Sequence, residues 1–195
     1  MRLRWVGDSR DYVKWDCVFK NSSGRFVFYL PMLRRNADAT CRHPEVQDHF
    51  DQSKDLDQFR RLFPNRFAVF SFSGREYAVE DADEYFGSAV VELAKLQRTQ
   101  SVLIFIDPDT GIEPVSGGRA EHLRSRDFCL VWESLRPRDR LIVYQHASRT
   151  KTWRQDLSNH ACDILRIEPS HVSDVYYDAR LANDVCFLVL EKSEL

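Results

Sequence analysis

A short apolar run at residues 101–106 constrains the fold most, because it ends directly in Asp107-Pro-Asp-Thr-Gly111. The run is too short for most helices and is bounded by polar residues, which is typical of a parallel strand buried on both faces. Pro108 cannot extend the hydrogen-bond ladder of a strand, and Gly111 favours a tight turn. The sequence therefore predicts a buried strand that ends in an acidic turn.

The segments around this run predict an α/β fold. Other apolar runs predict strands, and amphipathic spacing predicts helices. The predicted strands cover 25–32, 67–72, 140–144, 163–168 and 185–190, and the predicted helices cover 10–20, 82–97, 119–135 and 152–160. Residues 33–53 are expected to form a loop with short helical pieces, and residues 56–62 a helical turn. Because strands and helices alternate, we expect one α/β domain over residues 1–195, with an open, mainly parallel sheet and helices on both faces.

Composition narrows the class of protein. Apolar residues make up 43% and charged residues 30% of the chain, which is typical of a folded soluble domain. No apolar run is long enough for a transmembrane helix, and no apolar segment follows the basic start, so neither a membrane span nor a secretory signal is expected. A cytoplasmic location follows as the expectation. Five cysteines without close spacing favour reduced thiols over disulfides or a zinc site.

Charge and aromatic residues bear on nucleic acid as a partner. The net charge of −2 argues neither for nor against binding to nucleic acid. However, nine Lys and Arg residues lie between positions 116 and 154. This stretch could contact phosphates or form a solvated face. Trp15, Trp132 and Trp153 could stack on bases, although core packing explains tryptophan equally well.

Polar residues follow two strands that the topology brings side by side, and ligands of open α/β sheets bind beyond the carboxyl ends of strands. These candidate residues are Asp107, Asp109, Thr110, Gln145, His146 and Arg149. Two carboxylates at this spacing could hold a divalent cation or bind an amino group, or simply make a good turn. His146 could act as a general base, and Arg149 could hold a phosphate or a carboxylate.

The start of the chain adds further candidates. Asp8 or Ser9 can cap the helix that follows. Asp11 and Lys14 lie one helical turn apart, so they could form a surface ion pair or take part in the site. Ser116-Gly-Gly-Arg119 is interpreted as a mobile loop over the site rather than a phosphate-binding loop, because it lacks the Lys-Ser/Thr pair.

At Ile106-Asp-Pro-Asp109 the chain resembles the Asp-Pro-Pro-Tyr signature of class I S-adenosylmethionine-dependent adenine-N6 methyltransferases, more narrowly the bacterial ribosomal-RNA enzymes. Asp11-Tyr-Val-Lys14 is similar to an Asp-Val-Leu-Lys stretch near the start of that family. Tyr144-Gln-His-Ala-Ser-Arg149 is similar to its Tyr-Pro-x-x-x-Arg stretch. Residues 161–168 look like its following strand.

The resemblance implies a Rossmann-like transferase, related to methyltransferases, that binds S-adenosylmethionine and acts on a nucleic acid or a nucleotide. Asp107 would hydrogen-bond the amino group of the acceptor and orient it. Lys14 and Arg149 would contact phosphate or the carboxylate of the cofactor. The family's aromatic residue, which stacks on a flipped adenine, is replaced here, because the motif continues with Asp109 and Thr110.

Two alternatives stand beside this interpretation. In a metal-dependent hydrolase or nuclease, Asp107 and Asp109, with Asp8 or Asp11, would hold Mg²⁺ or Mn²⁺, and His146 would activate water. In the other alternative, the chain is a catalytically inert relative that serves as a binding module on the same fold.

Overall fold

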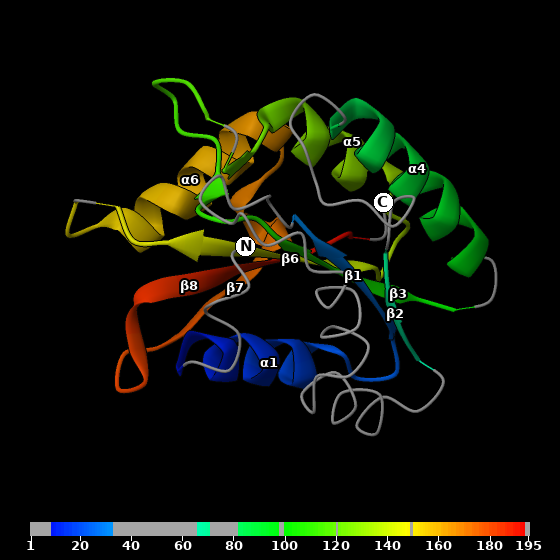
Figure 1. Cartoon of the computed structure of the whole chain (residues 1–195), viewed down its shortest axis with the longest axis horizontal. Helices are drawn as coiled ribbons and strands as arrows, with labels where there is room; N and C mark the ends of the chain where they lie inside the picture. The colour runs from blue at the N-terminus through cyan, green and yellow to red at the C-terminus, as the bar shows by residue number, and fades with distance from the viewer. Residues whose placement is uncertain are drawn as a thin grey trace, which may run out of the picture.

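The computed structural model describes residues 9–32, 66–70, 82–97, 100–119, 121–148 and 150–193. It confirms the predicted Rossmann-like α/β fold, with one main sheet of six strands (Figure 1). In spatial order the strands are β2 (Phe67–Val69), β1 (Phe26–Pro31), β3 (Val102–Asp107), β6 (Arg140–His146), β8 (Ala182–Glu191) and β7 (Val172–Asp178).

Most of the sheet is parallel. Strands β2, β1, β3 and β6 run in one direction, whereas β8 is antiparallel to both of its neighbours, β6 and β7. The register pairs Pro31 with Asp107 and Ile106 with Val143, so the carboxyl ends of three parallel strands meet at one edge. This confirms the prediction that the polar residues after β3 and β6 share an edge.

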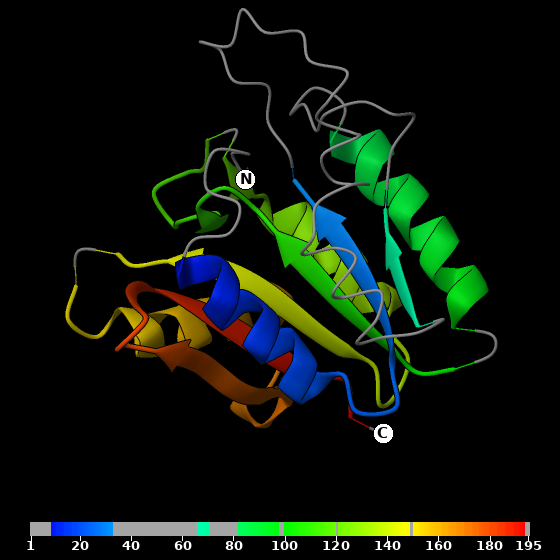
Figure 2. The same ribbon diagram turned by 60° about the horizontal axis from the view of Figure 1, so that its bottom comes forward.

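Helices cover both faces of the sheet, as predicted. The helices α4 (Ala82–Leu96), α5 (Ser125–Ser134) and α6 (Trp153–Leu165) lie on one face, and α1 (Ser9–Asn21) lies on the other (Figures 1 and 2). Each face has its own apolar core. The core under α4, α5 and α6 includes Phe86, Ile104 and Phe128, and the core under α1 includes Val18 and Phe187.

One predicted strand is wrong. Residues 163–165 continue α6, because Ala161, Cys162 and Leu165 bury one face of that helix at helical spacing. The helix ends at Arg166, which adopts the left-handed conformation with φ 54°. The residues that resembled the family's strand therefore belong mostly to a helix. The strand that follows is β7, after a short 3-10 turn at Pro169–His171.

The helix predicted over 119–135 begins later, at Ser125. Before it, β5 (His122–Leu123) pairs with β4 (Gly111–Ile112) in a small second sheet. Strand β2 ends at Val69, and the predictions for 33–62 and for 71–72 lie outside the described residues. In the part of the chain that the structure describes, no helix has the length and apolar character needed to cross a bilayer.

Candidate functional site

The site lies where the strand order reverses. From β1 the chain passes to β2 on one side and then returns to β3 on the other, so the gap between β1 and β3 is a topological switch point. Open α/β sheets bind ligands at such points, beyond the carboxyl ends of the strands. The two strands are joined there by a hydrogen bond of 3.1 Å from Met32 N to Asp107 O.

A buried ionic network lies at this switch point. Lys14 Nζ from α1 contacts Asp107 Oδ2 at 2.9 Å, and the side chains are only 4% and 1% exposed. The hydroxyl of Tyr29 on β1 donates to the same oxygen at 2.6 Å. Lys14 thus pairs with a carboxylate 93 positions away, and the side chain of Asp11, its expected surface partner, lies outside the described residues.

This network determines what Asp107 can do. Removing two charges from water costs several kcal/mol per ion, and the cost is offset only when geometry and hydrogen bonds are good. Here the ammonium of Lys14 supplies the counter-charge beside the carboxylate. Across the described ranges, no group of three or more His, Cys, Asp and Glu residues is arranged to hold a metal ion. A ligand that binds Oδ2 of Asp107 must therefore displace Lys14 or Tyr29.

Two further side chains on β6, Tyr144 and His146, extend this network. Lys14 Nζ lies over the ring of Tyr144, 5.6 Å from its centroid. The hydroxyl of Tyr144 is 2.9 Å from Nε2 of His146, and the two rings meet edge to face. The polar groups therefore form a chain from the buried carboxylate outward to the half-buried imidazole.

His146 lies in an environment that favours its neutral form. Burial lowers the pKa of His146 below its ordinary value of 6.5, and the positive charge of Arg10 acts in the same direction. The carboxylates of Asp184 and Asp109 oppose this shift, so both lie close enough to affect the imidazole. Arg10 is itself engaged with Asp184, with Nε 3.1 Å from Oδ2.

The lowered pKa of His146 predicts a pH-dependent stability. Between the ordinary pKa and the lower folded pKa, the unfolded state binds a proton that the folded state does not. Stability from His146 is thus fully present above pH 6.5 and is lost as the pH falls through the folded value. We expect urea unfolding at pH 7.5 and pH 5 to show a smaller loss for His146→Gln than for the wild type. Equal losses in the two proteins would contradict the buried, neutral imidazole.

Thr110 and Gln145, which were predicted to bind ligand, hold the turn after β3 together. Gln145 Oε1 accepts a hydrogen bond from Ile112 N at 2.8 Å, and the Thr110 hydroxyl donates to Glu121 O at 3.0 Å. Gly111 has φ 130°, and a Cβ atom there would lie 2.1 Å from Gln145 Oε1. The turn therefore needs both a glycine and the amide that packs against it.

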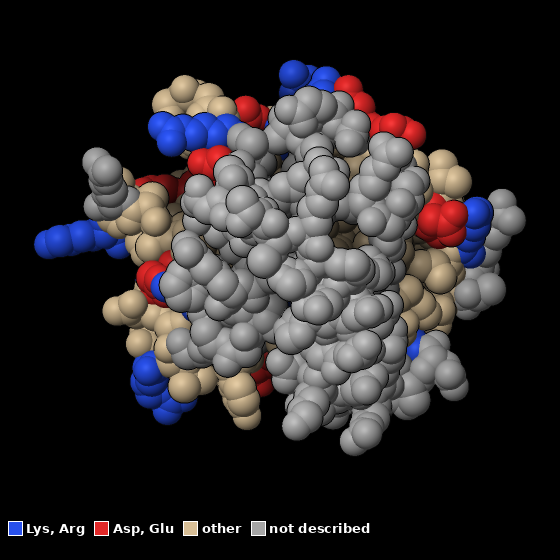
Figure 3. All heavy atoms as spheres, in the orientation of Figure 1, with Lys and Arg blue, Asp and Glu red and all other residues tan. Residues whose placement is uncertain are grey.

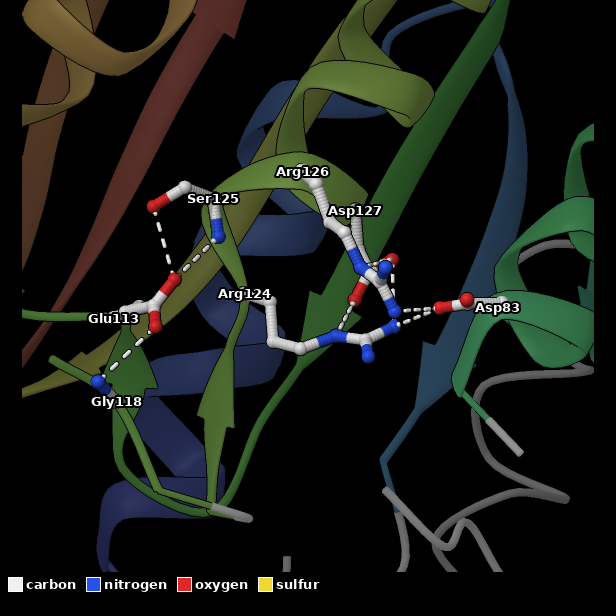
Figure 4. Close-up of polar contacts among 7 residues, drawn as sticks. All are labelled: Asp83, Glu113, Gly118, Arg124, Ser125, Arg126 and Asp127. Carbon is white, nitrogen blue, oxygen red and sulfur yellow. Dashed lines mark hydrogen bonds and ion pairs between the residues drawn. The ribbon is translucent and has the colours of Figure 1, made fainter. Parts of the chain in front are cut away.

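The carboxylate of Glu113 holds the loop that follows in place. Glu113 accepts hydrogen bonds from Gly118 N at 3.0 Å and from Ser125 N at 2.9 Å (Figure 4). The hydrogen bond from Ser125 N is the main reason that the pKa of Glu113 lies below its ordinary value. Glu113 thus joins the loop to the first residue of α5, where a negative charge also suits the helix dipole.

Two arginines of the predicted basic stretch are neutralised by acids beside this loop. Arg124 contacts Asp83 at 2.6 Å and Asp127 at 2.5 Å, and Arg126 also contacts Asp83 (Figure 4). Asp127 is almost fully buried, and that burial raises its pKa. The cluster joins the start of α4 to the start of α5 and leaves little net positive charge there.

Other described cations of the stretch lie at different ends of the sheet. Arg140 starts β6 at the opposite edge, where it contacts Glu191 at 2.6 Å. Lys151 lies just before α6, and Arg154 lies in its first turn. On the face seen in Figure 3, the basic and acidic side chains of the described residues are interspersed.

The structure thus brings Lys14, Asp107, Asp109 and His146 to one edge. Asp8 and Arg149 lie outside the described residues. Four residues of the site were not predicted, namely Arg10, Tyr29, Tyr144 and Asp184. A signal for two of them was present, because a tyrosine in a strand buried on both faces needs a partner for its hydroxyl.

The end of β1 is where the resemblance places S-adenosylmethionine, against main chain that a glycine-rich turn exposes. Here Pro31 O accepts a hydrogen bond from Tyr85 OH at 2.9 Å, and Met32 N is bonded to Asp107 O. Met32 is buried, and residues 29–35 contain no glycine. The described residues therefore do not fit the cofactor in that position.

The fold and the site define a Rossmann-like α/β protein with a buried charged network at the ligand-binding edge of its sheet. Comparisons with known protein families, with curated proteins and with solved structures find no match for the chain.

Proposed function

We propose that the protein is a Rossmann-like transferase that acts on a nucleotide or a nucleic acid, with the acceptor bound above the carboxyl ends of β3 and β6. The supporting observation is the buried network of Lys14, Asp107 and Tyr29 at the switch point. Buried ion pairs add little net stability, and this pair lies at the switch point where open α/β sheets bind their ligands. The network therefore has a better explanation in function than in stability.

The described residues provide acceptor binding and proton removal. His146 is kept neutral by burial, so its imidazole can take a proton from an attacking hydroxyl or amino group that replaces the hydroxyl of Tyr144 at Nε2. Asp109 is half-buried beside it, and its carboxylate can accept a hydrogen bond from the acceptor. Asp107, held by Lys14 and Tyr29, positions the turn that carries Asp109. These roles do not depend on the donor of the transferred group.

Calorimetry with three probes tests the proposal: S-adenosylmethionine, adenosine monophosphate and a single-stranded RNA dodecamer. We expect the wild type to bind a nucleotide or the RNA. Asp109→Asn and His146→Gln are expected to weaken that binding by about tenfold, the effect of losing one good polar contact. Asp163→Asn is the matched control, because Asp163 is exposed near the far end of α6; it should bind within about twofold of wild type. No heat from any probe, or equal binding by all variants, would contradict the proposal.

A second candidate is a binding module without catalysis on the same fold. It is favoured by the contacts of Asp107, because its Oδ2 already accepts hydrogen bonds from Lys14 and from Tyr29. The two candidates can be distinguished with S-adenosylmethionine as the donor. Transfer of its tritiated methyl group to the RNA would identify a transferase, and binding of the RNA without transfer would favour the binding module. Asp107→Ala is a poor test of either, because it leaves the ammonium of Lys14 buried without its partner.

A further inference from the structure

An arginine lies between two aromatic rings at the start of α6. The guanidinium carbon of Arg154 is 4.4 Å from the ring centroid of Trp153 and 3.9 Å from that of Tyr177. We call these three side chains the aromatic–arginine stack. Tyr177 comes from the end of β7, and the side chain of Arg154 reaches it from the start of α6.

The stack has one buried end and one open end. Trp153 is 8% exposed and packs in the core, whereas Tyr177 is 48% exposed. Arg154 donates to Asn183 O at 3.2 Å. Its Nε, alone among the buried side-chain nitrogen and oxygen atoms of the described residues, has no hydrogen-bond partner. Stacking on the rings therefore contributes much of what holds this guanidinium, and the guanidinium in turn fixes the exposed ring of Tyr177.

The stack lies on the same edge as the candidate site. Arg154 bonds the main chain of Asn183, the residue before Asp184. Asp184 O accepts a hydrogen bond from Ala147 N, directly after His146. His146, at the end of β6, and Tyr177, at the end of β7, therefore lie at the same edge of the sheet.

The charges around the stack suit a phosphate backbone. Lys151 is exposed two residues before Trp153. Arg180 is 89% exposed and contacts Asp178 at 3.0 Å. The nearby carboxylate of Asp156 accepts hydrogen bonds from Thr150 and Thr152. Arg180 balances Asp178, whereas Asp156 is bonded only by neutral hydroxyls and keeps its charge. The cations Lys151, Arg154 and Arg180 therefore outnumber the carboxylates of Asp156 and Asp178 by one.

We propose that the exposed ring of Tyr177 is a stacking site for an unpaired base of a single-stranded nucleic acid, with Lys151 beside the phosphate backbone. Bases stack on aromatic side chains only when they are free of a duplex, and arginine behind the ring strengthens such stacking. This inference rests on the proposed function and narrows its acceptor from a nucleotide to a single strand.

Fluorescence anisotropy with a labelled uridine dodecamer tests the stacking site on the full chain. Tyr177→Ala is expected to weaken binding about tenfold, because stacking on one aromatic side chain typically contributes that much. Tyr177→Phe keeps the ring and should bind within about twofold of wild type. The matched control is Tyr12→Ala, since Tyr12 is 74% exposed on α1, on the opposite face of the sheet. A duplex of the same length should compete poorly.

The outcomes separate this inference from the proposed function. Wild-type affinity in Tyr177→Ala, or equal competition by the duplex, overturns the stacking site. If Asp109→Asn and His146→Gln still weaken binding in that case, the proposed function stands without it. If only Tyr177→Ala weakens binding, the stacking site stands and the transferase assignment fails. Loss in Tyr12→Ala as large as in Tyr177→Ala also overturns the inference.

Discussion

Replacing Lys14 by methionine is expected to lower the free energy of unfolding by about 3–5 kcal/mol. The substitution keeps the length of the side chain but removes the charge that faces Asp107 at 2.9 Å. The carboxylate would then be buried without its counter-ion, and the hydroxyl of Tyr29 cannot replace a full charge. Urea unfolding at pH 7, followed by circular dichroism, measures the loss.

The double variant Lys14→Met/Asp107→Asn separates the cost of burying a charge from the contribution of the pair. It leaves no unpaired charge, and the new amide oxygen would still accept from Tyr29, so at least half of the lost stability should return. The control is Lys95→Met, because Lys95 and Glu92 form an exposed pair at 2.6 Å, and such pairs contribute about 0.2–1 kcal/mol. Similar losses for Lys14→Met and Lys95→Met would show that the network is not buried as described.

Gly111→Ala is the second substitution with a large expected effect, a loss of about 2–4 kcal/mol. Alanine rarely adopts φ 130°, and its Cβ would lie 2.1 Å from Gln145 Oε1. Gln145 would have to leave the turn, which removes its hydrogen bond to Ile112 N. Thermal unfolding of the variant measures the loss, and binding of the dodecamer shows whether Asp109 has moved with the turn.

Gly87→Ala provides the matched control for this prediction. Gly87 lies within α4, and an added Cβ would meet no heavy atom within 4 Å. Alanine is a better helix former than glycine, so this variant should gain about 0.5–1 kcal/mol. A loss at Gly87, or no loss at Gly111, would contradict the conformations described for these two positions.

The sequence was sufficient for the central strands and for β8, predicted at 185–190, and insufficient for the edge strand β7. Residues 101–106 and 140–144 are apolar because both of their faces are covered, and that pattern identifies buried strands. β7 is an edge strand with polar and half-buried residues, so no apolar run marks it. Ile164 and Leu165 were assigned to a strand because a short apolar stretch at the end of a helix has the same appearance.

The site was predicted in position but not in its contacts. Asp107 and His146 were found because they follow buried strands. The pairing of Lys14 with Asp107 joins residues 93 positions apart, and no local spacing indicates such a contact. Spacing along the helix suggested Asp11 instead. Gln145 was assigned to ligand binding because the sequence does not reveal whether its side-chain amide points outward or bonds the turn after β3.

The position of β8 limits the order in which the elements of the chain can fold. This strand is the last of the described elements to be synthesised, yet it lies between β6 and β7, and α1 packs against all three. A ribosome adds roughly 5–20 residues per second, so β6 leaves it several seconds before β8 can cover its open edge. Through that interval the nascent chain carries an unpaired strand edge, which is a template for aggregation. The first of the described helices, α1, can therefore complete its packing only after β8 is in place.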